Sequence, residues 1–451
     1  NYLTSAEFTW LQQYLPDTYE KEFERYGNRT ISSFLRMVGA EIPTNSDLIK
    51  WAESGRLHTK FTGARTANAA GATAATQTWL TGPLAAGLNA DCNFRVGQTI
   101  FISEEGAGAT ASNKAIIITV GVGSDDEFTV RYYENDQNVA AATNCTVFVY
   151  GSEFNKGANG MDGSLDADPN IFENKPIILK DKYLVSGSDM AQIGWIEVST
   201  ENGGGGYLWY LKSEHETRLR FEDYLEMSMV EAVPAAGASG VAANAATGQL
   251  GNQGSDGMFY VIETRGNVFS GTPAALADFD AIIQRLDKQG SIQENALFLN
   301  RATSFAIDDI LASQNSYGAG GTSYGLFDND EEMALNLGFS GFKRGYEFYK
   351  TDWKYLNDAT LRGGLTGGKI NGVLVPAGST TVYDQVLGKN AKRPFLHVRY
   401  RASESEDRRM KTWITGSAGG AATSDLDAME VNFLSERALC TMGANNFFIF
   451  Q

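Results

Sequence analysis

The amino-acid sequence predicts an α+β protein with a small all-β domain inserted in its first half. Apolar residues recur at steps of three and four in a few segments and at steps of two in many others, which indicates both helices and strands. The two kinds of segment do not alternate regularly, as a parallel sheet with crossover helices would require. The chain has 451 residues, including 49 glycines. That length predicts two to three structural units, and that glycine content predicts many turns.

The first 62 residues are predicted to form an N-terminal arm. Residues 4–39 have a helical pattern that Gly27 divides, and Gly39 stands where a helix would end. The polar segment that follows is expected to be extended, with one short helical turn around Trp51. Because this segment lacks an apolar face, we expect it to pack on another domain or another subunit.

Residues 63–155 are predicted to form the inserted β-barrel or β-sandwich. Residues 63–90 are mostly Ala, Gly and Thr, and from Phe94 to Phe154 the apolar pattern changes to a period of two. Turn residues divide that second part into four candidate strands. Such a module is about the smallest that can hold a core of its own.

Residues 156–213 are predicted to contain a long hairpin. The runs KPIILKDKYLVSGSDM and IGWIEVST read as two antiparallel strands, and they precede four consecutive glycines, Gly203–Gly206. A two-stranded hairpin cannot stabilise itself and needs a partner surface.

The remaining chain alternates helices with short strands. A helix is predicted from His215 to Ala232, and another from Pro273 to Gln289, with Thr272 as N-cap and Gly290 as C-cap. ALFLN is a candidate strand and ATSFAIDDILASQ a candidate helix. Further predicted strands are YEFYKTDW, GVLVP, PFLHVRYRA and MKTWITGS, followed by a helical SERALCTMGA and a terminal strand, NFFIF.

Composition restricts the function. A net charge of −17 makes the chain a poor candidate for wrapping DNA, which needs Lys and Arg on the phosphates. The charge fits either simple solubility or a shell whose inner face repels packed DNA. Three cysteines without CxxC spacing favour a reducing compartment. The sequence contains no run of about 20 apolar residues, so no membrane span is predicted.

No motif predicts an enzyme, a cofactor site or a metal site. Gly363–Ile370, GGLTGGKI, has the spacing of a phosphate-binding loop but lacks a Ser or Thr after Lys369, so a glycine-rich hairpin turn is favoured. Isolated histidines without metal-ligand spacing stand at His58, His215 and His397. A solvated loop is favoured over a weak calcium site for Asp162, Asp166 and Asp168.

Several runs, in this order along the chain, resemble the major capsid protein of tailed double-stranded DNA bacteriophages. They are LIKWAESGRLH, YGSEFNKGANGMDG with PIILKDKYLVSGSDMAQIG, YLKSEHETRLRFEDYLEMSMVEA, and NFLSERALCTMGANNFFIF. The resemblance implies the Hong Kong 97-type capsid fold, with the first 62 residues as N-terminal arm and residues 156–213 as its E-loop hairpin. Residues 214–451 would then form the peripheral domain, including a spine helix at 214–233, and the axial domain. WAESGRLH and SERALCTMGANN favour the crAss-like group.

The resemblance also implies a structural protein and not an enzyme. Copies of the chain would assemble into hexamers and pentamers of an icosahedral head that encloses double-stranded DNA, and no cofactor or metal is implied. Scaffold, cement or portal proteins would be possible partners, there would be no membrane, and assembly would occur in the host bacterial cytoplasm. Candidate inter-subunit contacts are Trp51, Arg56, Lys180, Tyr183, Trp195, Arg218 and Glu222.

Two other readings remain open. Another virion protein, such as a tail or portal component, has similar structural demands. A secreted carbohydrate-active or adhesive β-protein would also be glycine-rich, acidic and aromatic.

Overall fold

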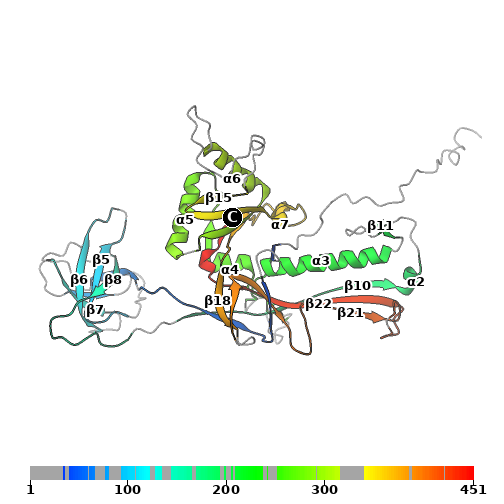
Figure 1. Ribbon diagram of the computed structural model, residues 1–451, viewed down its shortest axis with the longest axis horizontal. Coiled ribbons are helices and arrows are strands. Elements are labelled where there is room, and N and C mark those ends of the chain that lie inside the picture. The colour runs from blue at the N-terminus through cyan, green and yellow to red at the C-terminus, as the bar shows by residue number, and fades with distance from the viewer. Residues whose placement is uncertain are drawn as a thin grey trace, which may run out of the picture. The chain divides into compact units, whose positions relative to one another are not determined.

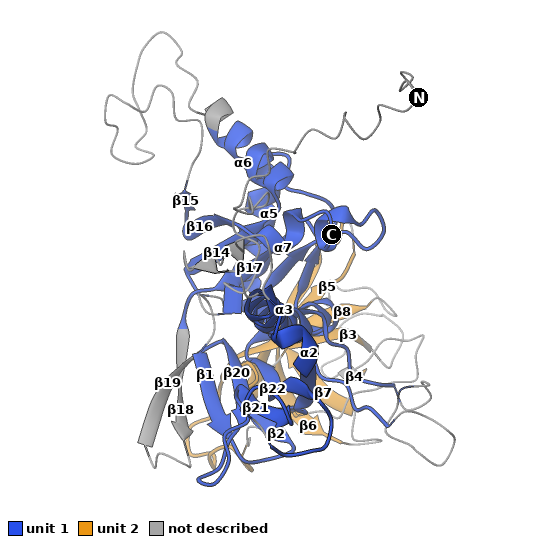
Figure 2. Ribbon diagram, turned by 90° about the vertical axis from the view of Figure 1, so that its right-hand side faces the viewer, with its two compact units in different colours: residues 1–51, 172–451 blue, residues 52–171 orange. Residues whose placement is uncertain are grey.

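The structure is a computed structural model with two compact units (Figure 2). One unit comprises residues 1–51 and 172–451, and the other residues 52–171. The residues that it describes are 34–35, 40–58, 60–66, 77–80, 93–106, 108–121, 127–134, 144–164, 169–192, 198–199, 205–206, 209–236, 241, 251–290, 292–314, 340–384, 389–420 and 422–451. Helices and strands are mixed within the described residues, which confirms the predicted α+β class. No helix among them is long and apolar enough to cross a membrane.

The smaller unit is a closed β-barrel with the strand order β3-β4-β7-β6-β5-β8. Its core packs Trp79 and Phe128, both fully buried, against Phe94. The indole Nε1 of Trp79 donates to the hydroxyl of Tyr132 at 3.0 Å, and burial raises the pKa of Tyr132 to about 12. The strands are β3 (Lys60–Thr66), β4 (Gln77–Leu80), β5 (Gln98–Glu104), β6 (Ser112–Val120), β7 (Glu127–Tyr132) and β8 (Cys145–Ser152).

Two of these strands lie outside the segments predicted as strands. The four-strand prediction corresponds to β5, β6, β7 and β8, whereas β3 begins in the predicted arm and β4 lies in the Ala-, Gly- and Thr-rich segment. Small residues obscured the period of two in that segment, and closure of the barrel requires both strands because they join β8 to β7.

The larger unit contains two sheets, of which the first has five strands among the described residues. Its order is β1-β20-β22-β10, and β21 also pairs with β22. The bounds are β1 (Ala40–Thr44), β10 (Ile177–Ser186), β20 (Leu396–Arg401), β21 (Lys411–Gly416) and β22 (Ala428–Thr441).

Two predictions about this sheet were wrong. The strand at 177–186 was expected to pair with 193–200, but β10 pairs antiparallel with β22, from Ile177 opposite Arg437 to Ser186 opposite Ala428. The run SERALCTMGA was expected to be helical, but it is strand up to Thr441. Its residues favour a helix in isolation, but β22 lies between β10 on one side and β21 and β20 on the other, so tertiary pairing overrides propensity.

Helix α3 (Trp209–Glu231) covers one face of this sheet, lying along β10 and β22 (Figure 1). It confirms the helix predicted at 215–232 and begins six residues earlier. Phe221 and Leu225 are buried against Val185 and Phe433, and the Phe221 and Phe433 ring centroids are 5.8 Å apart. The helix and the sheet therefore form a two-layer arrangement with its own apolar core.

The second sheet has the order β13-β23-β17-β14-β16-β15. Helices α5 (Leu276–Gln289) and α6 (Arg301–Gln314) contribute to its core, and α4 (Met258–Arg265) contacts both β13 and β23. The strands are β13 (Asn267–Phe269), β14 (Glu294–Leu299), β15 (Gly341–Arg344), β16 (Tyr346–Asp352), β17 (Gly372–Pro376) and β23 (Phe448–Phe450).

Most local predictions in this region are confirmed, although α5 begins at Leu276 and not at Pro273. The carboxylate of Asp278 accepts hydrogen bonds from the backbone of Ala274 (2.8 Å) and Ala275 (2.9 Å), and this carboxylate caps the helix start in place of Thr272. Gly290 ends the helix with φ 70°, as predicted.

The glycine-rich segment at 363–370 is a connection and not a hairpin turn. It joins β16 to β17, and these strands do not pair with each other because β14 lies between them.

The remaining elements are short: β2 (Ile49–Glu53) with β9 (Asn170–Asn174), β11 (Val198–Ser199) with β12 (Gly205–Gly206), β18 (Ser379–Asp384) with β19 (Lys389–Pro394), α2 (Gly187–Met190), α7 (Lys354–Asn357), η4 (Arg362–Gly364) and η5 (Ala444–Asn446).

A central core joins the two sheets and includes the predicted arm. Phe34 is buried, with its ring stacked 4.4 Å from Trp353 and edge-on 4.6 Å from Phe298. Its backbone N–H donates to the buried carboxylate of Glu226 on α3 at 3.1 Å. Apart from residues 34–35, the helix predicted at 4–39 lies outside the described residues.

Candidate assembly surfaces

The sheet opposite α3 has an uncovered face. Side chains of β10 alternate, and the residues that point away from α3 are exposed, including Ile178 (53%) and Leu184 (51%). Residues directly opposite each other in an antiparallel pair share a face. Lys182, Asn432 and Trp413 are opposite one another on three adjacent strands, so Trp413, 37% exposed, belongs to this face as well. We call this surface, made of Ile178, Lys180, Lys182, Leu184, Lys411 and Trp413, the bare face.

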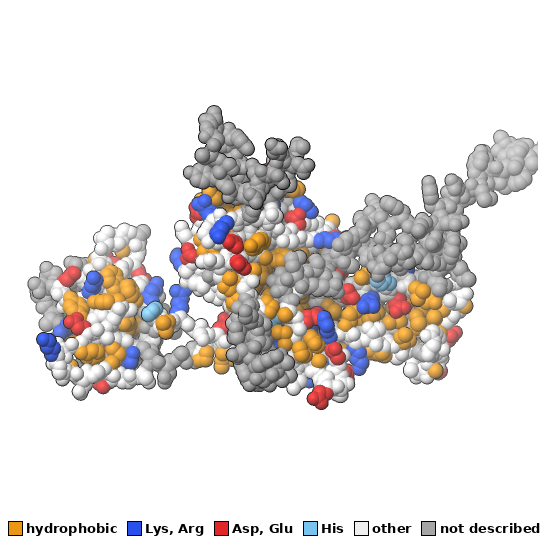
Figure 3. Space-filling view, in the orientation of Figure 1, with side chains coloured by type: hydrophobic (Ala, Val, Ile, Leu, Met, Phe, Trp, Pro, Cys, Tyr) orange, Lys and Arg blue, Asp and Glu red, His pale blue; other side chains and the backbone are white. Residues whose placement is uncertain are grey.

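The bare face carries lysines beside glutamates, because Glu436 and Glu430 of β22 are opposite Ile178 and Leu184. Lys182 forms an ion pair with Glu430 at 3.6 Å, and the ammonium of Lys411 lies 5.8 Å from the Trp413 ring centroid and 2.9 Å from Glu406. The visible side of this two-layer region mixes apolar with charged side chains (Figure 3). Exposed lysines on an apolar face can attract a partner surface of opposite charge.

The bare face ends at β10, the last strand of the described sheet. Among the described residues β10 pairs only with β22, so no described strand lies along its other edge. Lysine at an edge strand opposes indiscriminate pairing with another chain. Lys180 and Lys182 stand at alternate positions of that strand and are both exposed.

The structure places four of the predicted contact residues in this two-layer region. Lys180 lies on the bare face, but Tyr183 points to the other side, where it is half-buried beside α3. Arg218 and Glu222 lie on α3 and form an ion pair with each other at 3.5 Å. Their role as contacts between subunits stays a prediction.

The other three predicted residues are not among those that define the bare face. Trp51 is half-buried on β2, with its ring centroid 6.3 Å from that of Phe172, and the guanidinium of Arg265 lies 4.1 Å from the Phe172 ring centroid. Arg56 is exposed and belongs to the smaller unit. Trp195 lies outside the described residues.

The C-terminal end of α3 is held in place by a salt bridge to the glycine-rich connection. Arg362 donates through Nε to Glu231 Oε1 at 2.6 Å and through Nη2 to Oε2 at 2.5 Å, while its Nη1 donates to the carbonyl of Gly368 at 2.6 Å. Tyr355 donates to the same carboxylate at 2.5 Å, and burial together with that carboxylate raises the pKa of Tyr355. The segment that resembles a phosphate-binding loop therefore positions a helix end.

Strand β1, which lies within the predicted arm, is held by ion pairs. β1 pairs parallel with β20, and Glu41 accepts from Arg437 at 3.5 Å and forms an ion pair with Arg409. Burial lowers the pKa of Arg437, and Glu41 opposes that effect. Part of the segment expected to pack on another domain or another subunit thus packs on its own chain.

The described residues show no cluster that could bind a metal ion. No group of three His, Cys, Asp or Glu among them is close enough to hold a metal ion. His58 is exposed, His215 is on α3 and His397 is buried on β20, 3.2 Å from the carbonyl of Pro394. Cys145 and Cys440 are buried.

The uncovered sheet face could not be found from the sequence because it depends on pairing between distant strands. The alternation in IILKDKYLVS is visible in the sequence, and it indicates that one side of that strand is exposed. Trp413 and Lys411 join that side only through their shared partner β22.

No family model matches this chain, and neither does any curated protein. Among solved structures the chain is similar to one named for Microbacterium phage Oxtober96, at 8% identity and a TM-score of 0.40, covering 99% of this chain and 98% of that one. It is also similar to one named for Mycobacterium phage Ogopogo, at 10% identity and a TM-score of 0.39, covering 100% and 99%. A third, the asymmetric unit of the bacteriophage PhiM1 mature capsid, has 8% identity and a TM-score of 0.36, covering 67% and 78%. At such identities and TM-scores the likenesses do not establish a shared function.

Proposed function

We propose that this chain is a phage capsid subunit that assembles with copies of itself into a closed shell around double-stranded DNA. The observation that carries the proposal is the bare face, where exposed apolar side chains and lysines lie on a sheet whose other side α3 covers. An obligate assembly hides such a surface against a neighbour, and its interfaces are large and apolar.

Charge supports the same proposal. The acidic chain repels packed DNA instead of binding it, which suits a container. The lysines of the bare face then serve contacts between subunits, which attract an acidic partner surface at modest ionic strength. Hexamers and pentamers of an icosahedral head are the arrangement that we propose, with Lys180 among the contact residues.

The deletion of Ile177–Val198, which the predicted hairpin would favour as a test, is unsuitable. It removes β10, and with it Val185, which packs against Phe221 and Leu225 of α3. Loss of assembly would then reflect unfolding of the two-layer core.

Paired substitutions on the bare face give a sharper test. We expect Ile178→Asp with Leu184→Asp to leave the fold intact, because both side chains are about half exposed, and to abolish assembly, because two carboxylates would be placed in an apolar interface. The measurement is negative-stain electron microscopy of the purified chain, with circular dichroism and thermal unfolding to check the fold.

The matched control is Ile178→Val with Leu184→Ile, which keeps the bare face apolar and should still form closed shells. If the Asp variant forms shells equally well, the bare face is not an interface between subunits. A wild-type chain that forms only monomers, tubes or a single ring would contradict a capsid subunit and favour a tail or portal component.

A further inference from the structure

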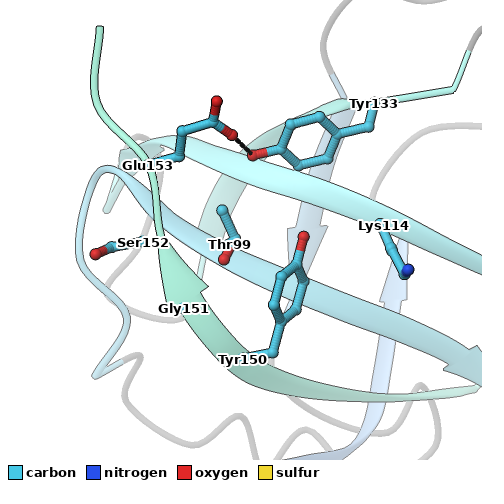
Figure 4. Close-up of a pocket in the computed structure, with 7 residues that line it drawn as sticks. All are labelled: Thr99, Lys114, Tyr133, Tyr150, Gly151, Ser152 and Glu153. Carbon is cyan, nitrogen blue, oxygen red and sulfur yellow. Dashed lines mark hydrogen bonds between the residues drawn. The ribbon is translucent and has the colours of Figure 1, made fainter.

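The barrel carries a hollow on its outer surface. It has a volume of about 480 Å³, within the usual range for small-ligand sites. Four adjacent strands or their ends contribute to it, since β7, β6, β5 and β8 are neighbours in the barrel. The residues that line it are Thr99, Lys114, Tyr133, Tyr150, Gly151, Ser152 and Glu153 (Figure 4).

Two tyrosines stand exposed at the hollow. Tyr133 is 48% exposed and Tyr150 is 50% exposed, although a small barrel already buries its aromatic core inside. Figure 4 shows both rings projecting beside the hollow from different strands. Apolar ring faces kept in water beside a concavity are typical of a surface that stacks on a ligand.

A β-bulge determines the direction of Tyr150. Thr99 of β5 is opposite Gly151, while the next residue, Ile100, is opposite Val149, so Tyr150 has no partner across the strands. Bulges re-aim a side chain and are frequent beside binding sites. A Cβ on Gly151 would lie 3.2 Å from the hydroxyl oxygen of Thr99, which also lines the hollow, so a larger side chain there would occupy part of it.

The polar groups at the hollow have opposite charges. Glu153, the residue directly after β8, accepts a hydrogen bond from the Tyr133 hydroxyl at 2.6 Å through Oε2. Partial burial and that carboxylate raise the pKa of Tyr133, so its hydroxyl stays a donor. Lys114 is exposed on β6 and contributes an ammonium group. The backbone carbonyl of Lys114 accepts a hydrogen bond from the backbone N–H of Tyr133 at 3.1 Å.

We propose that this hollow binds carbohydrate: one or two neutral sugar rings that stack on Tyr150 and Tyr133 and hydrogen-bond to Glu153 and Lys114. A pyranose ring offers an apolar face of C–H groups for an aromatic ring and hydroxyls that donate to a carboxylate and accept from an ammonium. One cation balanced by one anion does not select an anionic or a cationic ligand. The site is additional to the proposed assembly function and does not depend on it, since every residue belongs to the barrel.

The test is saturation-transfer NMR and calorimetric titration of the full chain with cellobiose, N-acetyllactosamine and mannobiose. We expect millimolar or tighter binding of at least one, with transfer strongest to the C–H protons of one ring face. Tyr150→Ala should weaken binding at least about tenfold, as loss of a stacking ring does, and Gly151→Val should do the same by filling the hollow.

The matched control is Tyr349→Ala. Tyr349 is 54% exposed on β16 of the larger unit, and its hydroxyl also donates to a glutamate, Glu347, at 3.4 Å. Binding should be unchanged in this variant, and thermal unfolding checks that each barrel variant is folded. No binding of the three disaccharides, or equal binding by Tyr150→Ala, would overturn the proposal. So would binding of a sulfated oligosaccharide only, abolished by Lys114→Ala, because that outcome marks an anion site.

Discussion

At the residue scale, Asn174 shows how one buried polar side chain can join three segments. Its amide nitrogen donates to the carbonyls of Leu439 (2.6 Å) and Asp256 (3.0 Å), and its oxygen accepts from the Ser255 hydroxyl (3.0 Å) and from the backbone of Asp256 (2.9 Å) and Lys175 (2.7 Å). The side chain is 3% exposed. Nothing in the local sequence distinguishes this asparagine from a turn residue, because its partners are distant in the chain.

Replacing Asn174 by Ala should lower the free energy of unfolding by about 3 kcal/mol, since several buried backbone groups would lose their partner. Urea unfolding of the dissociated subunit measures the change. The control is Asn432→Ala, which removes a hydrogen bond of 3.1 Å to Thr415 at a partly exposed position and should cost less than about 1 kcal/mol. Equal effects of the two variants would contradict the role of Asn174.

At the scale of the element, the local patterns were informative and the pairings were not. Helices α5 and α6 were found because caps and apolar spacing lie within the segment itself. The partner of β10 lies far along the chain, and register depends on the face that the partner strand offers, so a nearby run was chosen instead. The bulge at Tyr150 could not be predicted from the local sequence either, because it depends on how β8 pairs with β5.

The salt bridge between α3 and the glycine-rich connection leads to a second stability prediction. Arg362→Ala should destabilise the protein by about 2 kcal/mol, because the half-buried Glu231 and the buried Tyr355 would lose their shared cation. Arg218→Ala is the control: that guanidinium is 59% exposed and pairs along the same helix, so its removal should cost about 0.5 kcal/mol or less. Chemical denaturation compares the two, and a double-mutant cycle with Glu231→Gln isolates the pair. A coupling energy near zero would show that Arg362 acts only through packing.

At the scale of the whole molecule, the sequence predicted the class and the presence of an inserted β domain because compositional change along the chain is large. It placed the start of the barrel late, since β3 and β4 have few large apolar residues. The arm was expected to seek a partner, and Phe34 and β1 find one within the same chain. These contacts depend on buried space that only the complete fold creates.

Separate cores predict separate unfolding. The barrel buries its own cluster around Trp79 and Phe128, and the larger unit has its own clusters around both sheets. We expect differential scanning calorimetry of the dissociated chain to show two transitions, and a chain with residues 54–169 replaced by a short Gly-Ser linker to keep one. A single cooperative transition in the intact chain would contradict this independence.

The pairing of β2 with β9 has a practical consequence. The chain leaves for the barrel and comes back at strands that lie side by side, and Lys50 on one is 3.1 Å from Glu173 on the other. Closely spaced ends are what allow one domain to be exchanged for another within a host chain. A foreign antigen or enzyme whose termini are adjacent fits the same two junctions, so every copy of the protein would carry one guest without any change to the two sheets of the larger unit.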